Sequence, residues 1–406
     1  MLFRGQIGGR SACVSFKDTS VSLSIGTGWV AAWDAGGRLY TLWRGGHTYR
    51  RGLNGRMLLA RGGGFQDAGL PVERRGRVAL GDHEADALLD EAAGRAGDAR
   101  AALAAWGDET RRPPGEAVLA VLRRASCFDA RSAREDARRF ARVYRPIGIL
   151  PPDQYLSVVV QATEGCSFGS CTFCNLYHDA YRVKTPQEFR THLREVRAYL
   201  GDSIGLRRRS IFLGAANALA VRMGRLVDLF GMLSPGLDIP APRVCAFVDG
   251  FTGARKTGAD YARLRELGLW RVYVGLESGD DDLLAFVRKP ATSEETVGTV
   301  RAIKHAGVSV GVIVLIGLGG GRFAAAHAER TAAAISAMGL DAGDLVFFSD
   351  LVESPETVYP HAAAREGVRP LAREARLGQV ETIRSHSAFP GPPPRFARYD
   401  VRAFVY

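Results

Sequence analysis

Cysteine is scarce in this 406-residue sequence, and long apolar runs are missing from it. No run approaches the roughly 18 residues that a membrane-spanning helix needs, so we expect no membrane partner. The first ten residues lack the apolar segment of a secretory signal, which favours a cytoplasmic location. Only six residues are cysteine, and three of them fall within nine positions, which excludes a disulfide scaffold. We therefore expect reduced thiols that are available as metal ligands.

Lysine is also rare, because only five of the 54 basic residues are lysine and the others are arginine. The net charge is +11, and residues 1–150 carry 24 basic and 16 acidic side chains, so +8 of that charge lies there. Arginines dispersed in this way usually form a solvated surface. A nucleic-acid partner for this part of the chain is therefore the minor interpretation.

The first part of the chain predicts strands followed by helices. Residues 11–57 contain short apolar runs separated by pairs of glycine, which predicts a small antiparallel sheet with tight turns. The helical patterns that follow cover residues 84–93, 100–106 and 114–144. We expect an interruption near Ser126, and Pro151 and Pro152 mark a boundary. The predicted domains are a β-then-α accessory region at 1–150, a core at 151–360, and a helix with an aromatic tail at 361–406.

Beyond Asp153, short β runs alternate regularly with amphipathic helices. The predicted strands cover residues 156–161, 210–213, 244–248, 271–276, 308–316 and 345–350. The predicted helices between them cover residues 186–200, 223–233, 260–267, 292–306 and 324–338. Six β/α units predict an α/β fold, a partial (β/α)6 TIM-like barrel with its chemistry at the carboxyl ends of the strands. A helix at 371–383 follows, and the aromatic segment 396–406 can pair as a final strand.

The most specific motif lies in the loop after the first of these strands. Cys166, Cys171 and Cys174 have the spacing C-x4-C-x2-C, and no fourth cysteine lies nearby. Three thiolates can hold three corners of a four-iron cluster and leave one iron open to a ligand. The alternative is a structural zinc site with His178 as its fourth ligand, although such sites usually draw on two separated ligand pairs.

This loop resembles the cluster loop of the radical S-adenosylmethionine (radical SAM) enzymes. Phe173 matches the aromatic residue before their last cysteine, and Glu164 and Gly165 precede the loop as in a subgroup with this longer spacing. The barrel also resembles that of oxygen-independent coproporphyrinogen oxidases. The resemblance implies a barrel of radical SAM type, with a [4Fe-4S] cluster and S-adenosylmethionine (SAM) as cofactors.

The same resemblance implies contacts to SAM from the turns after several strands. The implied cofactor-binding residues are Phe173, Gly214, Ala215, Ala216, Asn217, Glu277, Ser278, Lys289 and Gly317. The candidate substrate-facing residues are Tyr177, His178, Asp350 and Glu353. The acidic residue usual in the turn at Asn217 is absent. For Glu277 a salt bridge in the barrel mouth is the alternative, and for Lys289 an exposed charge.

The resemblance implies that SAM is cleaved reductively to a 5′-deoxyadenosyl radical, which removes hydrogen from a substrate that the sequence does not identify. The electron would come from a flavodoxin or a ferredoxin, and no catalytic side chain is assigned. Two other functions stay open: a zinc-containing module that binds RNA, and a relative that holds a cluster or haem without catalysis. The missing acid near Asn217 is the observation that favours the non-catalytic relative.

Overall fold

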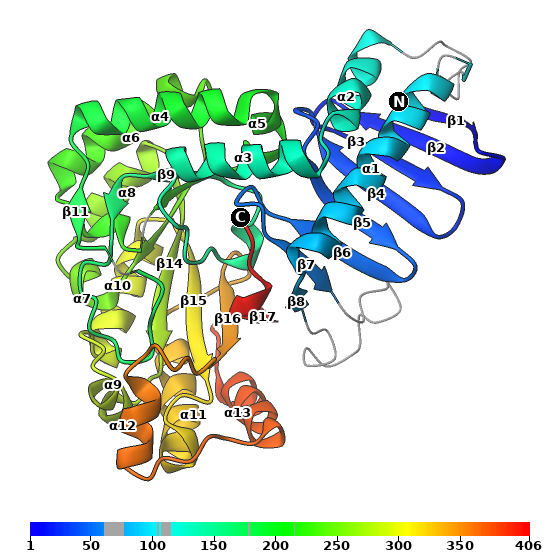
Figure 1. The fold of residues 1–406 in the computed structure, drawn as a ribbon. Helices are drawn as coiled ribbons and strands as arrows, with labels where there is room; N and C mark the ends of the chain where they lie inside the picture. The colour runs from blue at the N-terminus through cyan, green and yellow to red at the C-terminus, as the bar shows by residue number, and fades with distance from the viewer. Residues whose placement is uncertain (61–76, 104, 107–114, 178, 215) are drawn as a thin grey trace. The chain divides into compact units, whose positions relative to one another are not determined.

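One antiparallel sheet and one parallel sheet contain most strands of this protein (Figure 1). The computed structural model describes residues 1–60, 77–103, 105–106, 115–177, 179–214 and 216–406. These residues form two units, each built around one of the sheets. Unit 1 consists of Met1–Ile147, Glu195–Arg209 and Arg402–Tyr406, and unit 2 consists of Gly148–Arg194 and Ser210–Val401.

The sheet of unit 1 has eight strands in chain order, and each is antiparallel to the next. They are β1 (Leu2–Ile7), β2 (Arg10–Lys17), β3 (Ser20–Ile25), β4 (Trp29–Asp34), β5 (Leu39–Arg44), β6 (His47–Arg51), β7 (Met57–Ala60) and β8 (Arg77–Ala79). Gly8 and Gly9 form the first turn with positive φ angles of 54° and 72°, which glycine adopts without a steric cost. The predicted antiparallel sheet is confirmed, and it extends beyond both ends of its predicted range.

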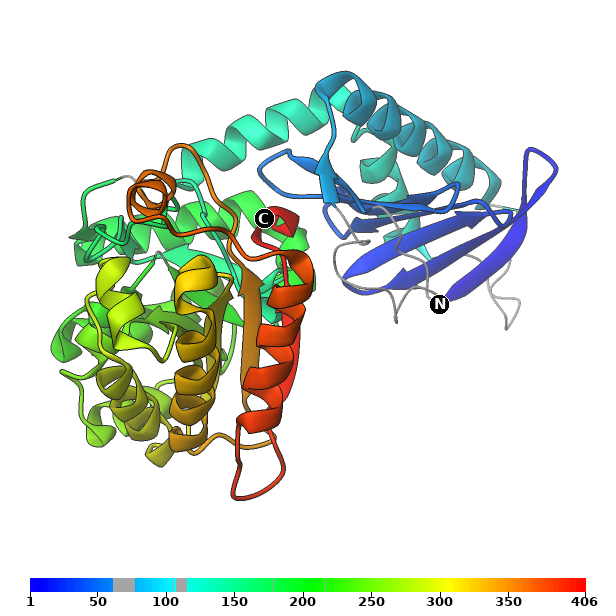
Figure 2. The same cartoon turned by 90° about the horizontal axis from the view of Figure 1, so that it is seen from below.

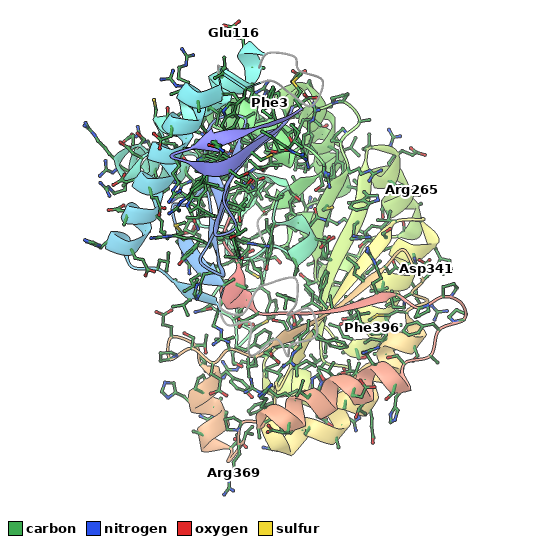
Figure 3. The ribbon with its side chains drawn as sticks, turned by 90° about the vertical axis from the view of Figure 1, so that its right-hand side faces the viewer. Phe3, Glu116, Arg265, Asp341, Arg369 and Phe396 are labelled. Atoms are coloured by element: carbon green, nitrogen blue, oxygen red, sulfur yellow. The ribbon has the colours of Figure 1, made fainter. Side chains whose placement is uncertain are left out.

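In the described part of the first 150 residues, three helices follow the sheet: α1 (Asp82–Leu103), α2 (Glu116–Ser126) and α3 (Ala130–Val143). Leu88 of α1 and Leu122 of α2 share one core with Phe3 of the sheet, so these helices cover one sheet face (Figures 2 and 3). The prediction of separate helices at 84–93 and 100–106 is wrong, because α1 continues through two glycines. A glycine inside a helix costs only about 1 kcal/mol, and the buried alanines of α1 offset that cost by packing. The interruption near Ser126 is confirmed.

The sheet of unit 2 has seven parallel strands, each paired with its neighbours in chain order. They are β9 (Val158–Gln161), β12 (Ile211–Gly214), β13 (Val244–Val248), β14 (Leu269–Glu277), β15 (Ser309–Ile316), β16 (Leu345–Asp350) and β17 (Arg395–Tyr399). The first and last of these do not pair within the described ranges, so the barrel is partial. The predicted fold class is confirmed, and the aromatic tail supplies a seventh strand. Phe396 of that strand, which is labelled in Figure 3, stacks on Phe348, and their ring centroids are 5.9 Å apart.

The helices after the first 150 residues alternate with these strands. They are α4 (Pro186–Leu200), α5 (Ile204–Arg207), α6 (Met223–Leu237), α7 (Gly250–Gly253), α8 (Gly258–Glu266), α9 (Asp281–Phe286), α10 (Ser293–His305), α11 (Gly320–Ala337), α12 (Tyr359–Arg365) and α13 (Arg373–His386). Thr292 and Glu295 form a capping box at the start of α10, which begins as predicted. No helix in the described ranges is long and apolar enough to cross a membrane.

Candidate functional site

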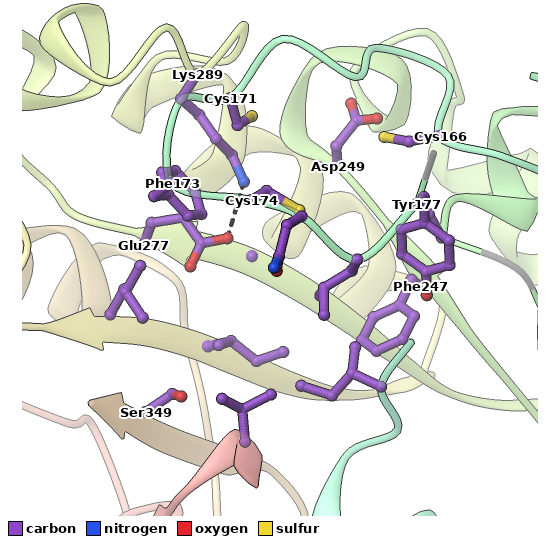
Figure 4. Close-up of a pocket in the computed structure, with 18 of the residues that line it drawn as sticks. Cys166, Cys171, Phe173, Cys174, Tyr177, Phe247, Asp249, Glu277, Lys289 and Ser349 are labelled. Carbon is purple, nitrogen blue, oxygen red and sulfur yellow. Dashed lines mark hydrogen bonds and ion pairs between the residues drawn. The ribbon is translucent and has the colours of Figure 1, made fainter. Parts of the chain in front are cut away.

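A cavity of about 260 Å³ lies in unit 2, at the carboxyl ends of its parallel strands (Figure 4). We call it the cysteine pocket, because all three cysteines of the C-x4-C-x2-C loop line it. Asp249 directly follows β13, Glu277 ends β14 and Asp350 ends β16, so three different strands bring a carboxylate to it. The remaining wall is mainly apolar: Ile149, Pro151, Leu176, Phe247, Ile313, Leu315, Leu351 and Val352.

Two short strands close the base of the cysteine loop. β10 (Thr163–Glu164) pairs with β11 (Arg182–Val183), and Glu164 forms ion pairs with Arg182 at 2.7 Å and with Lys184. Burial opposes ionisation of Glu164, but hydrogen bonds from Lys184 and Arg182 outweigh burial and lower its pKa. Gly165 has a φ of +68°, and a Cβ there would overlap the carbonyl oxygen of Asp179. The loop therefore needs a glycine where it leaves its base.

The middle of the loop is held by its backbone at Thr172. The Thr172 amide donates to the carbonyl of Val287 at 3.0 Å, and its carbonyl accepts from the Tyr359 amide at 2.9 Å. The next residue, Phe173, packs against the apolar cluster that contains Leu283 and Tyr359. These contacts fix the segment between Cys171 and Cys174 without using either thiol.

The thiols suit a cluster better than a single ion. Within the described ranges, no group of three His, Cys, Asp or Glu side chains is placed to hold one metal ion. A zinc ion needs every ligand within about 2.3 Å of one point, whereas each cysteine of a four-iron cluster binds an iron of its own. The described side chains do not bring the three thiols to one such point, and the fourth ligand of the zinc alternative, His178, lies outside the described residues.

Burial raises the pKa of Cys171 to about 11, against the opposing charge of Lys289, and it also raises the pKa of Cys174. Both side chains are therefore protonated thiols at neutral pH when no metal is bound. Because iron binds thiolates, loading must release their protons.

Glu277 and Lys289 form an ion pair inside the pocket. Lys289 Nζ lies 3.0 Å from Glu277 Oε1, and 9% and 14% of the respective side chains are exposed (Figure 4). Burial opposes the charge of Lys289, but the negative charge of Glu277 outweighs it and raises the pKa of Lys289. The salt-bridge alternative for Glu277 is thus what the structure contains, whereas Lys289 is not an exposed charge. Glu277 has a φ of +59°, which is strained for a residue with a Cβ.

Asn217 places the turn after β12 against Asp249, which is not among the predicted site residues. The Asn217 amide donates to Asp249, to Ser167 Oγ at 2.9 Å and to Thr252 Oγ1 at 2.9 Å. In Figure 4 the Cys166 side chain points toward the Asp249 carboxylate. A carboxylate therefore stands beside the turn from which an acid is missing. The available signal was its position directly after the third predicted strand.

The other predicted residues divide between the pocket and its surroundings. Ala216, Tyr177 and Asp350 line it, and Arg398 binds both oxygens of Asp350 at 2.7 Å. Burial raises the pKa of Tyr177. Ala215 lies outside the described residues. Four predicted residues are not part of the pocket lining: Gly214, Ser278, Gly317 and Glu353.

Ser278 and Gly317 make contacts of another kind. The Ser278 hydroxyl is completely buried and lies 2.7 Å from His327 Nδ1. The Gly317 amide donates to Gln379 Oε1 at 2.9 Å. Both residues thus shape the turns behind the pocket wall.

Part of the chain matches a known protein family. Residues 160–323 match the family model described as the radical SAM superfamily. No curated protein sequence matches the chain.

Several solved structures are similar at low sequence identity. A methylornithine synthase is 16% identical, with a TM-score of 0.40, over 59% of this chain and 70% of that chain. The radical SAM methyltransferase TsrM from Kitasatospora setae is 18% identical, with a TM-score of 0.41, over 57% of this chain and 45% of its own. The coproporphyrinogen III oxidase of Escherichia coli is 16% identical, with a TM-score of 0.40, over 60% and 53%. The chain thus spans about half the length of the last two.

Proposed function

Residues 160–323 match the radical SAM superfamily model, and on this premise we propose that the cysteine pocket binds a [4Fe-4S] cluster and cleaves SAM reductively. Enzymes of this superfamily use a [4Fe-4S] cluster and SAM as cofactors. The observation that carries the proposal is that Cys166, Cys171 and Cys174 line one pocket together with the Glu277–Lys289 ion pair. When bound, the cluster supplies the electron that splits SAM into methionine and a 5′-deoxyadenosyl radical, which takes a hydrogen atom from the substrate.

Within this proposal, the charged side chains of the pocket bind and orient SAM. Lys289 attracts its carboxylate, and Glu277 accepts hydrogen bonds from the ribose hydroxyls or the ammonium group. Asp249 accepts from the ammonium group in place of the acid that is missing near Asn217. Both members of the Glu277–Lys289 ion pair line the pocket, so it offers an acidic and a basic group to a zwitterionic ligand.

The apolar wall performs a different task, which is to exclude water from the reacting atoms. Phe247, Ile313 and Leu351 contribute to this wall, and Arg398 neutralises Asp350 at its edge. We propose that the substrate meets the radical against this wall, near Tyr177. The substrate itself is unassigned, and a flavodoxin or ferredoxin is the proposed electron donor.

The test is anaerobic reconstitution with iron and sulfide, followed by dithionite, SAM and chromatography for 5′-deoxyadenosine. Wild-type protein should turn brown and produce it, and Cys174→Ala should lose both properties. Cys127→Ala is the matched control, because Cys127 is an exposed free cysteine of unit 1 and should behave as wild type. Catalysis of SAM cleavage would be contradicted if the wild-type protein turned brown but made no more 5′-deoxyadenosine than Cys174→Ala.

The alternative of a non-catalytic relative loses the observation that favoured it. That alternative rested on the missing acid near Asn217, and Asp249 brings a carboxylate to the same place. Titration of the protein with haem, monitored by absorption, provides the direct check. The proposed function expects no saturable haem binding.

A further inference from the structure

A second cavity of unit 2, of about 200 Å³, reaches the cysteine loop from outside the pocket. Thr172 lines this cavity, whereas its neighbours Cys171 and Phe173 line the cysteine pocket. The rest of the lining comes from the end of α9 and from α12, which lie side by side, since the rings of Phe286 and Tyr359 are 6.2 Å apart (Figure 1). A single residue of the loop therefore separates this surface from the proposed cluster ligands.

Two arginines give the rim of this cavity a positive charge, and its centre is apolar. Arg288, His361 and Arg365 are exposed on the rim, and Val358 between them is 54% exposed. The acid among the lining residues, Glu366, lies 3.3 Å from Arg322, which neutralises it. An apolar centre with a charged rim is the usual anatomy of a protein interface, and the sign of this rim selects an acidic partner.

We propose that this surface, formed by Arg288, Val358, His361 and Arg365 and here called the α12 face, docks an acidic one-electron carrier protein. The inference rests on the proposed function, because the carrier would reduce the cluster of the cysteine pocket. In the exchange the carrier is oxidised by one electron and the cluster is reduced by one, and no bond is made or broken.

A short chain of bonds joins the α12 face to the cysteine loop. Val358 is covalently linked to Tyr359, whose amide donates to the carbonyl of Thr172 at 2.9 Å. Thr172 is in turn covalently linked to Cys171. A carrier seated on Val358 would thus be connected to a cluster ligand through one hydrogen bond and a few backbone bonds.

A rival surface lies on another part of the same loop. Phe168 is 45% exposed and its ring centroid is 6.4 Å from that of Phe251, over which Arg255 lies at 4.6 Å. This patch offers an aromatic anchor and one arginine, whereas the α12 face offers two arginines and a histidine around a cavity. The charge of the α12 face makes it the better fit to an acidic carrier, and the Phe168 patch provides a discriminating variant.

The experiment uses reconstituted full-length protein and an acidic flavodoxin, with two readouts. Calorimetric titration should show binding that weakens as salt is added, and at least tenfold weaker binding to Arg365→Glu and to Val358→Glu. Both side chains are exposed, so neither variant should affect folding. Arg301→Glu, an exposed position on α10, is the control that introduces the same charge elsewhere and should bind as wild type. The second readout is 5′-deoxyadenosine, which the two variants should form normally with dithionite but poorly with reduced flavodoxin.

The outcomes separate the docking face from the proposed function. Unchanged flavodoxin affinity in Arg365→Glu and Val358→Glu overturns the α12 face, as does a loss of affinity in Phe168→Ala alone. Absence of 5′-deoxyadenosine from wild-type protein with either reductant contradicts the proposed function instead. The measured affinities still decide the docking face in that case, because they do not depend on turnover.

Discussion

Ser278 Oγ lies 2.7 Å from His327 Nδ1, and this contact fixes the turn that follows the strained Glu277. Thr331, one turn further along α11, accepts a hydrogen bond from the Gly279 amide at 2.8 Å. Helix α11 thus holds the residues directly after Glu277 from outside the cysteine pocket. Strain at a functional position persists only where its surroundings hold it in this way.

Burial of His327 predicts a specific pH dependence of stability. Burial lowers its pKa to about 4, with a hydrogen bond to the backbone of Leu315 opposing the shift. The unfolded chain has a histidine pKa near 6.5 and binds the proton first, so stability is complete above about pH 6.5 and falls as pH drops toward 4. From this group we expect a loss of about 2 kcal/mol between pH 7 and pH 5. Urea unfolding of wild type and of His327→Gln at the two pH values measures this loss of unfolding free energy. The loss should be smaller in the variant by that amount. An identical loss in both proteins would assign the pH dependence to other groups.

The cysteine loop and Glu277 could be predicted because each lies in a short contiguous motif, whereas Lys289 is twelve residues from Glu277 and nothing local indicates that the two side chains pair. The position of Asp249 after a strand was visible in the sequence, but its contact with Asn217 was not, because that contact depends on two parallel strands whose partners are set by the whole sheet. Ser278 shows a second limit. It follows Glu277 directly, at an irregularity where the register of β14 and β15 shifts, and the two side chains point to different sides.

The β strands and long helices of unit 2 were predictable for a different reason. Their apolar patterns are strong, as in the nearly continuous apolar run of β15, where Val310, Val312 and Val314 are completely buried. The short helices α7, α9 and α12 were missed because each is too brief to show a period. Residues 195–209 and 402–406 belong to unit 1 through long-range contacts that no local pattern reveals.

Two glycines of the cysteine loop provide a matched pair for testing its shape. Gly165 and Gly169 both have a φ of +68°, but a Cβ at Gly165 would overlap the backbone of Asp179, whereas at Gly169 nothing lies within 4 Å. Gly165→Ala should therefore lose most of the iron bound after reconstitution. Gly169→Ala carries only the left-handed strain of roughly 1–2 kcal/mol and should retain it. Iron and sulfide analysis after desalting is the measurement, and equal iron in both variants would contradict the steric argument.

Removal of the Lys289 charge should weaken SAM binding. Lys289→Met leaves the Glu277 carboxylate buried without its partner and removes the proposed contact to the SAM carboxylate. A hydrogen bond to a charged group is worth about 1.5–3 kcal/mol, so we expect the Kd for SAM to rise about 10- to 100-fold. Calorimetry on reconstituted protein under argon measures this change.

Two further variants separate binding from structure at this pair. Lys17→Met removes an exposed lysine of unit 1 and should bind SAM as wild type does. The double variant Glu277→Gln/Lys289→Met has no unpaired charge and should regain stability but not SAM affinity. Recovery of wild-type affinity in the double variant would mean that the pair is structural only.

Substitution of Asp249 tests whether its carboxylate replaces the acid that is missing from the turn at Asn217. Its Oδ1 accepts from the Thr252 amide at 2.6 Å and caps α7, and its other oxygen accepts from Asn217. Asp249→Asn keeps an oxygen for the cap but removes the charge, so iron content should stay at the wild-type level. If the carboxylate binds the ammonium group of SAM, the Kd should rise about tenfold, which corresponds to 1.4 kcal/mol. Asp228→Asn, at an exposed position on α6, is the control. Unchanged SAM affinity in Asp249→Asn would mean that Asp249 only caps α7. The acid missing near Asn217 would then again favour a non-catalytic relative.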